Sequence, residues 1–173
     1  VFVGKRIDNP KNFWQMPQGG VNQNENFLQA AKRELEEETG IKSVELVKEL
    51  NGWLGYDLPE NLLGKVLEGK YRGQKQKWFI MKFIGKDNEI NVKTKNPEFL
   101  DWKWIKVSKL PSIAVDFKAN LYEKLKEEIN FLKLTTTSGS FEVSIHFQSK
   151  NSGFLVFILI SSLFPRNFII NHF

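Results

Sequence analysis

Three glutamates near the end of one predicted helix are the residues of this sequence best suited to chemistry. Glu34, Glu37 and Glu38 fall on one face, within roughly a third of the circumference at about 100° per residue. Carboxylate oxygens are the ligands that Mg²⁺ and Mn²⁺ prefer. A metal held in this way can neutralise phosphate oxygens and activate a water for attack at phosphorus.

This acidic cluster opposes the ordinary electrostatics of a helix. Like charges at i,i+3 and i,i+4 cost about 0.2–0.5 kcal/mol per pair, and the last turns already carry the negative end of the macrodipole. A compensating cation is therefore expected, although a solvated acidic face would produce the same pattern. Glu36 lies on the opposite side and is expected to be solvated. The small Ala30 and Ala31 before the cluster, and the Gly19-Gly20 turn before the helix, favour the functional interpretation.

Apolar periodicity and turn residues predict strands and helices in alternation around this cluster. A helix is expected over residues 26–39, ended by Gly40. A second begins at Asp116 or Phe117, with a core stripe at Phe117, Leu121, Leu125, Ile129 and Leu132. Strands are predicted at residues 1–6, 44–51, 77–84 and 102–106, an extended piece at 12–16 and a turn at 17–20. This mixture predicts a layered α/β or α+β domain.

The stretch from Gly19 to Ile41 resembles the Nudix box. Glu25 follows Gly19 after five residues, and after seven more comes the run Arg33-Glu34-Leu35-Glu36-Glu37-Glu38-Thr39-Gly40-Ile41. The resemblance implies an α/β/α sandwich with a mixed sheet, and a hydrolase that cleaves a nucleoside diphosphate linked to another group with a divalent metal. It implies that Glu34, Glu37 and Glu38 are the metal ligands or the base. In the box, Glu25, Arg33 and Gly40 are then structural, the first two as an ion pair.

Segments outside the box resemble the bacterial RNA pyrophosphohydrolase and dinucleoside polyphosphate hydrolase branch of this family. They are residues 14–20, 53–59, 73–79, 97–99, 102–104 and 116–118, with Tyr122. This resemblance implies Mg²⁺ or Mn²⁺ as cofactor, Glu98 as a further metal ligand, and 5′-triphosphorylated RNA as the substrate that loses pyrophosphate or successive phosphates. A dinucleoside polyphosphate such as diadenosine tetraphosphate is the alternative substrate. A non-catalytic RNA- or nucleotide-binding Nudix module is the alternative from another class of function.

The candidate substrate-binding residues are Arg6, Gln18, Gly19, Tyr56, Lys75, Lys77, Phe117 and Lys118. Lys75 and Lys77 are two apart on a strand, so both point to one face, where they can bind a polyphosphate or simply be exposed to solvent. Phe117 or Tyr56 can stack a base at roughly 1–3 kcal/mol, although Phe117 can equally pack in the core. The resemblance places the Phe117–Lys118 pair beside the nucleotide.

The composition changes near residue 134. Beyond it the charged residues are Glu142, Lys150 and Arg166 alone, so we divide the chain into a Nudix domain, residues 1–134, and a hydrophobic tail, residues 135–173. Alternation at 141–147 and an apolar run at 154–160 predict two strands in the tail. We expect the family's first strand to be missing, which leaves a sheet edge unpaired. The tail is expected to be dispensable unless one of its strands fills that edge.

The composition limits the classes of protein that remain. With 41% hydrophobic and 26% charged residues the chain is globular, and it has no cysteine, which excludes disulfides and thiolate metal sites. Its net charge of +5 suits an acidic partner such as phosphate or nucleic acid. No apolar run approaches the ~20 residues of a membrane span, and the start lacks a signal-peptide pattern. We expect a cytoplasmic protein with no membrane association.

Overall fold

The computed structural model describes residues 1–8, 13–137 and 155–165 of the chain. Its strands are β1 (Phe2–Arg6), β2 (Trp14–Gln15), β3 (Gln18–Gly19), β4 (Val44–Glu49), β5 (Leu54–Asp57), β6 (Tyr71–Phe83), β7 (Phe99–Trp104) and β8 (Leu155–Pro165). Its α-helices are α1 (Phe27–Thr39), α2 (Leu110–Ile113) and α3 (Ala119–Thr137), and its 3-10 turns are η1 (Glu60–Leu62), η2 (Leu67–Gly69), η3 (Asp87–Glu89), η4 (Val107–Lys109) and η5 (Asp116–Lys118). Within these ranges, no helix has both the length and the apolar character that crossing a membrane requires.

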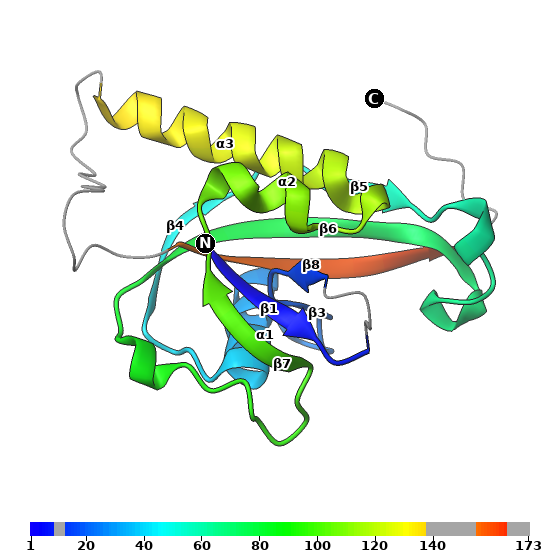
Figure 1. Cartoon of the computed structure of the whole chain (residues 1–173), viewed down its shortest axis with the longest axis horizontal. Helices are drawn as coiled ribbons and strands as arrows, with labels where there is room; N and C mark the ends of the chain where they lie inside the picture. The colour runs from blue at the N-terminus through cyan, green and yellow to red at the C-terminus, as the bar shows by residue number, and fades with distance from the viewer. Residues whose placement is uncertain (9–12, 138–154, 166–173) are drawn as a thin grey trace.

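The strands form two sheets that lie between helices, as Figure 1 shows. One sheet has the order β2-β1-β7, and all its pairs are antiparallel. The other has the order β3-β8-β6-β4, with β5 also paired to β6. In this second sheet β3 and β8 run parallel and the other pairs are antiparallel. With α1 on one side and α2 and α3 on the other, the predicted α/β/α sandwich with a mixed sheet is confirmed.

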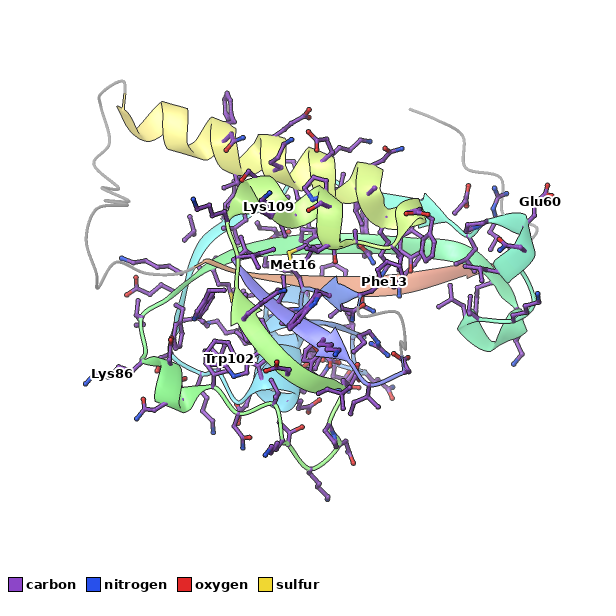
Figure 2. All side chains as sticks on the ribbon, viewed as in Figure 1. Phe13, Met16, Glu60, Lys86, Trp102 and Lys109 are labelled. Atoms are coloured by element: carbon purple, nitrogen blue, oxygen red, sulfur yellow. The ribbon has the colours of Figure 1, made fainter. Side chains whose placement is uncertain are left out.

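The long strand β6 separates two hydrophobic cores. Successive side chains of a strand point to opposite faces, so its buried residues divide between the cores by alternate positions. Trp78 and Ile80 face α2 and α3, in a core shared with Val1, Val3, Met16, Leu50, Leu110, Ala114, Leu121, Tyr122, Leu125 and Ile129. Phe79, Met81 and Phe83 face α1, in a core shared with Phe2, Ala30, Ala31, Leu35, Ile41, Ile90, Val92 and Phe99. In Figure 2, Met16 accordingly lies beneath α2, whereas Trp102 lies away from that helix, beside the second core.

The helices lie close to their predicted positions. α1 begins one residue later than predicted and ends at Thr39, and Gly40 follows with a φ of 74°. The predicted second helix is divided, because η5 precedes α3, which begins at Ala119. Of its predicted core stripe, Leu121, Leu125 and Ile129 are buried.

β5 was not predicted, and β7 begins three residues before the predicted strand. β6 and β3 also differ from the prediction, each for a physical reason. β6 begins at Tyr71 rather than at residue 77, because buried polar residues obscured the strand pattern there. Gln74 and Gln76 satisfy each other in part, since Gln76 Nε2 donates to Gln74 Oε1 (2.8 Å). The turn predicted at residues 17–20 contains the short strand β3, because β8 lies beside it.

β8 belongs to the segment that the composition sets apart as a tail. It corresponds to the strand predicted at 154–160, whereas the strand predicted at 141–147 lies outside the described residues. β8 runs between β3 and β6 (Figure 1), antiparallel to β6 from Tyr71 opposite Pro165 to Lys82 opposite Leu155. A tail strand therefore lies along β6, as in the alternative that one of the tail's strands fills an open sheet edge. The boundary predicted at residue 134 falls inside α3.

Candidate active site

Local hydrogen bonds fix both ends of α1. Asn26 Oδ1 accepts from Gln29 N (2.9 Å) while Gln29 Oε1 accepts from Asn26 N (3.0 Å), which is a capping box. At the other end, Gly40 N donates to Glu36 O (2.8 Å) in the left-handed conformation that glycine adopts without strain. Leu35 is fully buried against the sheet. The predicted glutamates are therefore carried on a rigid element.

Arg33 organises the loop in front of the helix. Its Nε and Nη2 donate to Glu25 Oε1 (2.9 Å) and Oε2 (3.0 Å), and Nη2 also donates to Gly20 O (2.8 Å). Its Nη1 donates to Glu34 Oε1 (2.8 Å) and to Glu37 Oε2 (2.9 Å). The hydrogen bond with Glu25 is the main cause that raises the pKa of Arg33. Arg33 and Glu25 thus stand in the ion pair that the resemblance implied, and Arg33 also counters the charge of two helix glutamates.

Glu34 is pressed against the glycine turn. Its Oε1 accepts from Gly20 N (3.1 Å), and its side chain is only 15% exposed. A Cβ built on Gly19 would overlap the Glu34 carboxylate. Glycine is required at position 19 because the backbone of β3 and this carboxylate come into direct contact. Burial raises the pKa of Glu34, and Arg33 acts in the opposite direction.

Glu38 is the most deeply buried carboxylate of the set, with 2% of its surface exposed. Its Oε2 accepts from Gln18 N (3.1 Å), whereas its Oε1 is buried without a hydrogen-bond partner. The pKa of Glu38 is raised well above its ordinary value. Burial is the main cause, and the negative charge of the nearby Glu98 is the second. A buried carboxylate without compensation is costly. A divalent cation would provide that compensation, and hard oxygen donors from Glu38, Glu34 and Glu98 suit Mg²⁺ and Mn²⁺.

Glu37 is placed differently from the other two helix glutamates. Its side chain is 59% exposed and is bonded to Arg33. Across the described ranges, no three His, Asp or Glu side chains already stand in a metal-binding arrangement. The fit to a metal therefore rests on the donor chemistry and on the orphaned Glu38 oxygen.

A second group of predicted residues gathers on the other side of β3, around Gln18. Lys118 Nζ donates to Gln18 Oε1 (3.3 Å) and lies 5.1 Å from the centroid of the Tyr56 ring. The Tyr56 and Phe117 rings are 5.2 Å apart, and Tyr56 Oη donates to Gln74 Oε1 (3.1 Å). Burial, followed by the positive charge of Arg6, lowers the pKa of Lys118 to about 8. Gln18 therefore contacts Glu38 through its backbone and Lys118 through its side chain.

A small cavity of about 30 Å³ opens beside Lys118. It is lined by Arg6, Phe13, Trp14, Gln15, Ala114, Val115, Lys118 and Tyr122. Arg6 also contacts Glu98, since its Nη1 donates to Glu98 Oε2 (3.0 Å). The cavity, Arg6 and Glu98 connect the basic and aromatic group to the carboxylate group.

The two lysines of β6 are placed on the face that α1 covers, at alternate positions with Phe79. Lys77 Nζ forms an ion pair with Glu49 (2.8 Å) and donates to Leu50 O (3.0 Å), and its side chain is only 13% exposed. These two contacts anchor Lys77 to the end of β4 rather than to the glutamates of α1. Lys75 is half-buried on the same face.

Sequence reasoning missed Asp8, which pairs with Arg6. Arg6 Nε and Nη2 donate to Asp8 Oδ1 (2.6 Å) and Oδ2 (2.7 Å). The available signal was the spacing of opposite charges two residues apart at a strand end. It also missed Gln74, because a glutamine in a polar run gives no sign of burial.

Comparison with known proteins agrees with this arrangement. A model of the NUDIX domain matches residues 1–132. An RNA pyrophosphohydrolase of Pelagibacter ubique is 62% identical over 129 residues, which cover 75% of this chain and 82% of the relative. RNA pyrophosphohydrolases of Rhodospirillum rubrum and Wolbachia pipientis are each 47% identical, over 75% of this chain and 78% and 80% of the relatives. The chain, with its glutamates on a capped helix behind a glycine turn, belongs to the Nudix family.

Proposed function

We propose that this chain is a hydrolase that removes pyrophosphate, or successive phosphates, from the 5′ end of triphosphorylated RNA. The observation that carries the proposal is the buried Glu38 carboxylate, which has an orphaned oxygen and is linked through Gln18 to the cation of Lys118. This arrangement supports a site for a divalent cation next to a site for phosphate. The relatives named RNA pyrophosphohydrolase, at 62% and 47% identity, support RNA as the substrate class.

In this proposal Glu34, Glu37, Glu38 and Glu98 hold Mg²⁺ or Mn²⁺. When bound, such a cation neutralises phosphate oxygens and lowers the pKa of a bound water. One of the helix carboxylates accepts the proton of the attacking water. As the water oxygen bonds to phosphorus, the phosphoanhydride bond breaks and pyrophosphate leaves.

The remaining candidates bind and orient the RNA. Arg6 and Lys118 counter the charge that develops on the leaving phosphates. The adjacent Tyr56 and Phe117 rings, 5.2 Å apart, offer an aromatic surface for a base near the 5′ end. Four other residues complete the proposed set: Gln18 and Gly19, in the strand that separates the two groups, and Lys75 and Lys77 in β6. Lys77 contributes positive charge from the same face as Lys75.

The test compares two substrates at equal concentration. We expect kcat/KM for a 5′-triphosphorylated oligoribonucleotide to exceed that for diadenosine tetraphosphate, with pyrophosphate or phosphate released only when Mg²⁺ or Mn²⁺ is present. A preference for the dinucleotide by orders of magnitude would refute RNA as the substrate. Binding of RNA without any metal-dependent release would instead identify a non-catalytic module. An RNA substrate and a chain without cysteine fit the proposed cytoplasmic location.

A further inference from the structure

Arg6 is held by a carboxylate that lies outside the proposed metal set. Its Nε donates to Asp8 Oδ1 (2.6 Å) and its Nη2 donates to Asp8 Oδ2 (2.7 Å), which is a bidentate pair. Its Nη1 donates to Glu98 Oε2 (3.0 Å). One guanidinium therefore joins Asp8, in the turn after β1, to Glu98, just before β7.

Backbone contacts bring these residues together independently of the ion pairs. Arg6 is opposite Phe99 in the β1–β7 ladder, and Ile7 N donates to Glu98 O (3.0 Å). The Arg6 side chain is 26% exposed and that of Asp8 is 63% exposed. Asp8 thus approaches the guanidinium from the solvent, while Glu98, whose side chain is 45% exposed, lies near enough to the Glu38 carboxylate to raise its pKa.

The two carboxylates differ in what the proposed reaction requires of them. A divalent cation on Glu98 would compete with Arg6 Nη1 for the carboxylate and would repel the guanidinium. Asp8 is not a proposed metal ligand, so its two hydrogen bonds to Arg6 persist when the cation binds. A bidentate carboxylate–guanidinium pair fixes the orientation of the guanidinium as well as its position.

We propose that Asp8 is a positioning residue, which keeps the Arg6 guanidinium oriented toward the 5′-phosphates once a divalent cation has taken Glu98. This inference rests on the proposed function, because it requires a phosphate-bearing substrate. The charges nearby support it. Burial is the main cause that lowers the pKa of Lys118, and the positive charge of Arg6 lowers it further. The negative charge of Asp8 raises it. Asp8 therefore also offsets the repulsion between two cations that must meet the same phosphates.

Asp8→Asn tests the inference, because it keeps the size and one acceptor oxygen but removes the charge. The probe is a 5′-triphosphorylated oligoribonucleotide with methylene groups bridging its phosphates, whose Kd is measured by calorimetry with Mg²⁺ and with EDTA. With Mg²⁺ we expect binding about tenfold weaker than in the wild type, as for loss of one charge-assisted hydrogen bond. In EDTA we expect a change of about twofold or less, because Glu98 still holds Arg6.

Two variants control the test. Asp8→Glu restores the bidentate pair and is expected to stay within about threefold of the wild type in both conditions. Glu60→Gln removes the same charge from an exposed residue in η1, at the end of the molecule opposite Lys86 (Figure 2), and is expected to change neither Kd. With hydrolysable RNA, Asp8→Asn should lower kcat/KM by about tenfold or more, because Arg6 both binds the phosphates and counters the charge that develops as they leave.

The outcomes separate this inference from the function on which it rests. Equal losses with Mg²⁺ and with EDTA, or no loss with Mg²⁺, would overturn the role of Asp8 while the wild type still hydrolyses RNA. A melting temperature of Asp8→Asn equal to that of the wild type excludes misfolding, as expected for an exposed side chain. A wild-type protein that neither binds nor hydrolyses triphosphorylated RNA would refute the proposed function, and this inference with it.

Discussion

Removing β8 should unfold the domain. β8 occupies an interior position of its sheet, between β3 and β6, so deletion of residues 155–173 leaves β3 without its strand partner and exposes one edge of β6 along most of its length. This expectation is the opposite of the dispensable tail that the composition suggested. It follows the alternative in which a tail strand fills the open edge.

The size of the effect follows from the length of the ladder. β8 has 11 residues, and its pairing with β6 extends from one end of the strand to the other. A ladder of this length holds roughly ten backbone hydrogen bonds, each worth about 0.5–1.5 kcal/mol net. Their sum, on the order of 5–15 kcal/mol, is comparable with the whole free energy of unfolding of an ordinary domain.

Thermal melts of three chains test this reasoning. The full chain and a chain lacking only residues 166–173 should melt together, whereas a chain lacking residues 155–173 should show no cooperative transition or a melting temperature lower by more than about 15 °C. Ile160→Pro, which removes a backbone donor between Gly19 and Lys77, should destabilise the full chain by about 3 kcal/mol or more. If the chain without residues 155–173 melts within a few degrees of the full one, β8 is not part of the stable sheet.

Three further predictions concern the site. Gly19→Ala should lower kcat by at least ~10²-fold because the added methyl displaces the Glu34 carboxylate, and circular dichroism should show that the fold is retained. Glu37→Gln should lower activity by at least ~10²-fold without loss of stability, whereas the ion-paired, exposed Glu36 should tolerate the same change in a parallel assay. The KM for triphosphorylated RNA should rise as the pH increases through about 8, because Lys118 loses its charge above its pKa. Lys118→Arg should abolish that rise, and a flat wild-type profile would contradict the assignment.

The parts of the fold that could be predicted are those whose signals are local. α1 was predictable because Asn26, Gly40 and the spacing of apolar residues all lie within the helix or beside it. The apolar half of β6 was predictable for the same reason. Its polar half was not, because the burial of Gln74 and Gln76 depends on the neighbouring strand and on a bond between their own amides. The turn pattern at residues 17–20 does not predict β3, because the strand that pairs with β3 lies far away along the chain.

The candidate site was predictable in its residue types more than in its geometry. Helical spacing alone places Glu34, Glu37 and Glu38 on one face and cannot tell which of them is buried. The position of β3 decides which glutamate is buried. The β3 backbone donates a hydrogen bond to Glu38, whereas Glu37 pairs with Arg33 and is exposed to solvent. The pairing of Arg6 with Asp8 depends on the turn after β1, which strand periodicity does not describe.

The position of β8 also determines the order in which the molecule can assemble. Gln18 pairs with Leu159, so the sheet that contains β3 closes only after residues 155–165 become available. Contacts between residues so distant in sequence slow folding, because the loop must close before the contact forms. Until then β6 presents an open edge next to its apolar residues, which is the kind of surface that associates with other chains. Nascent chains of this protein should therefore be most prone to aggregation after β6 has been synthesised and before β8 has joined it.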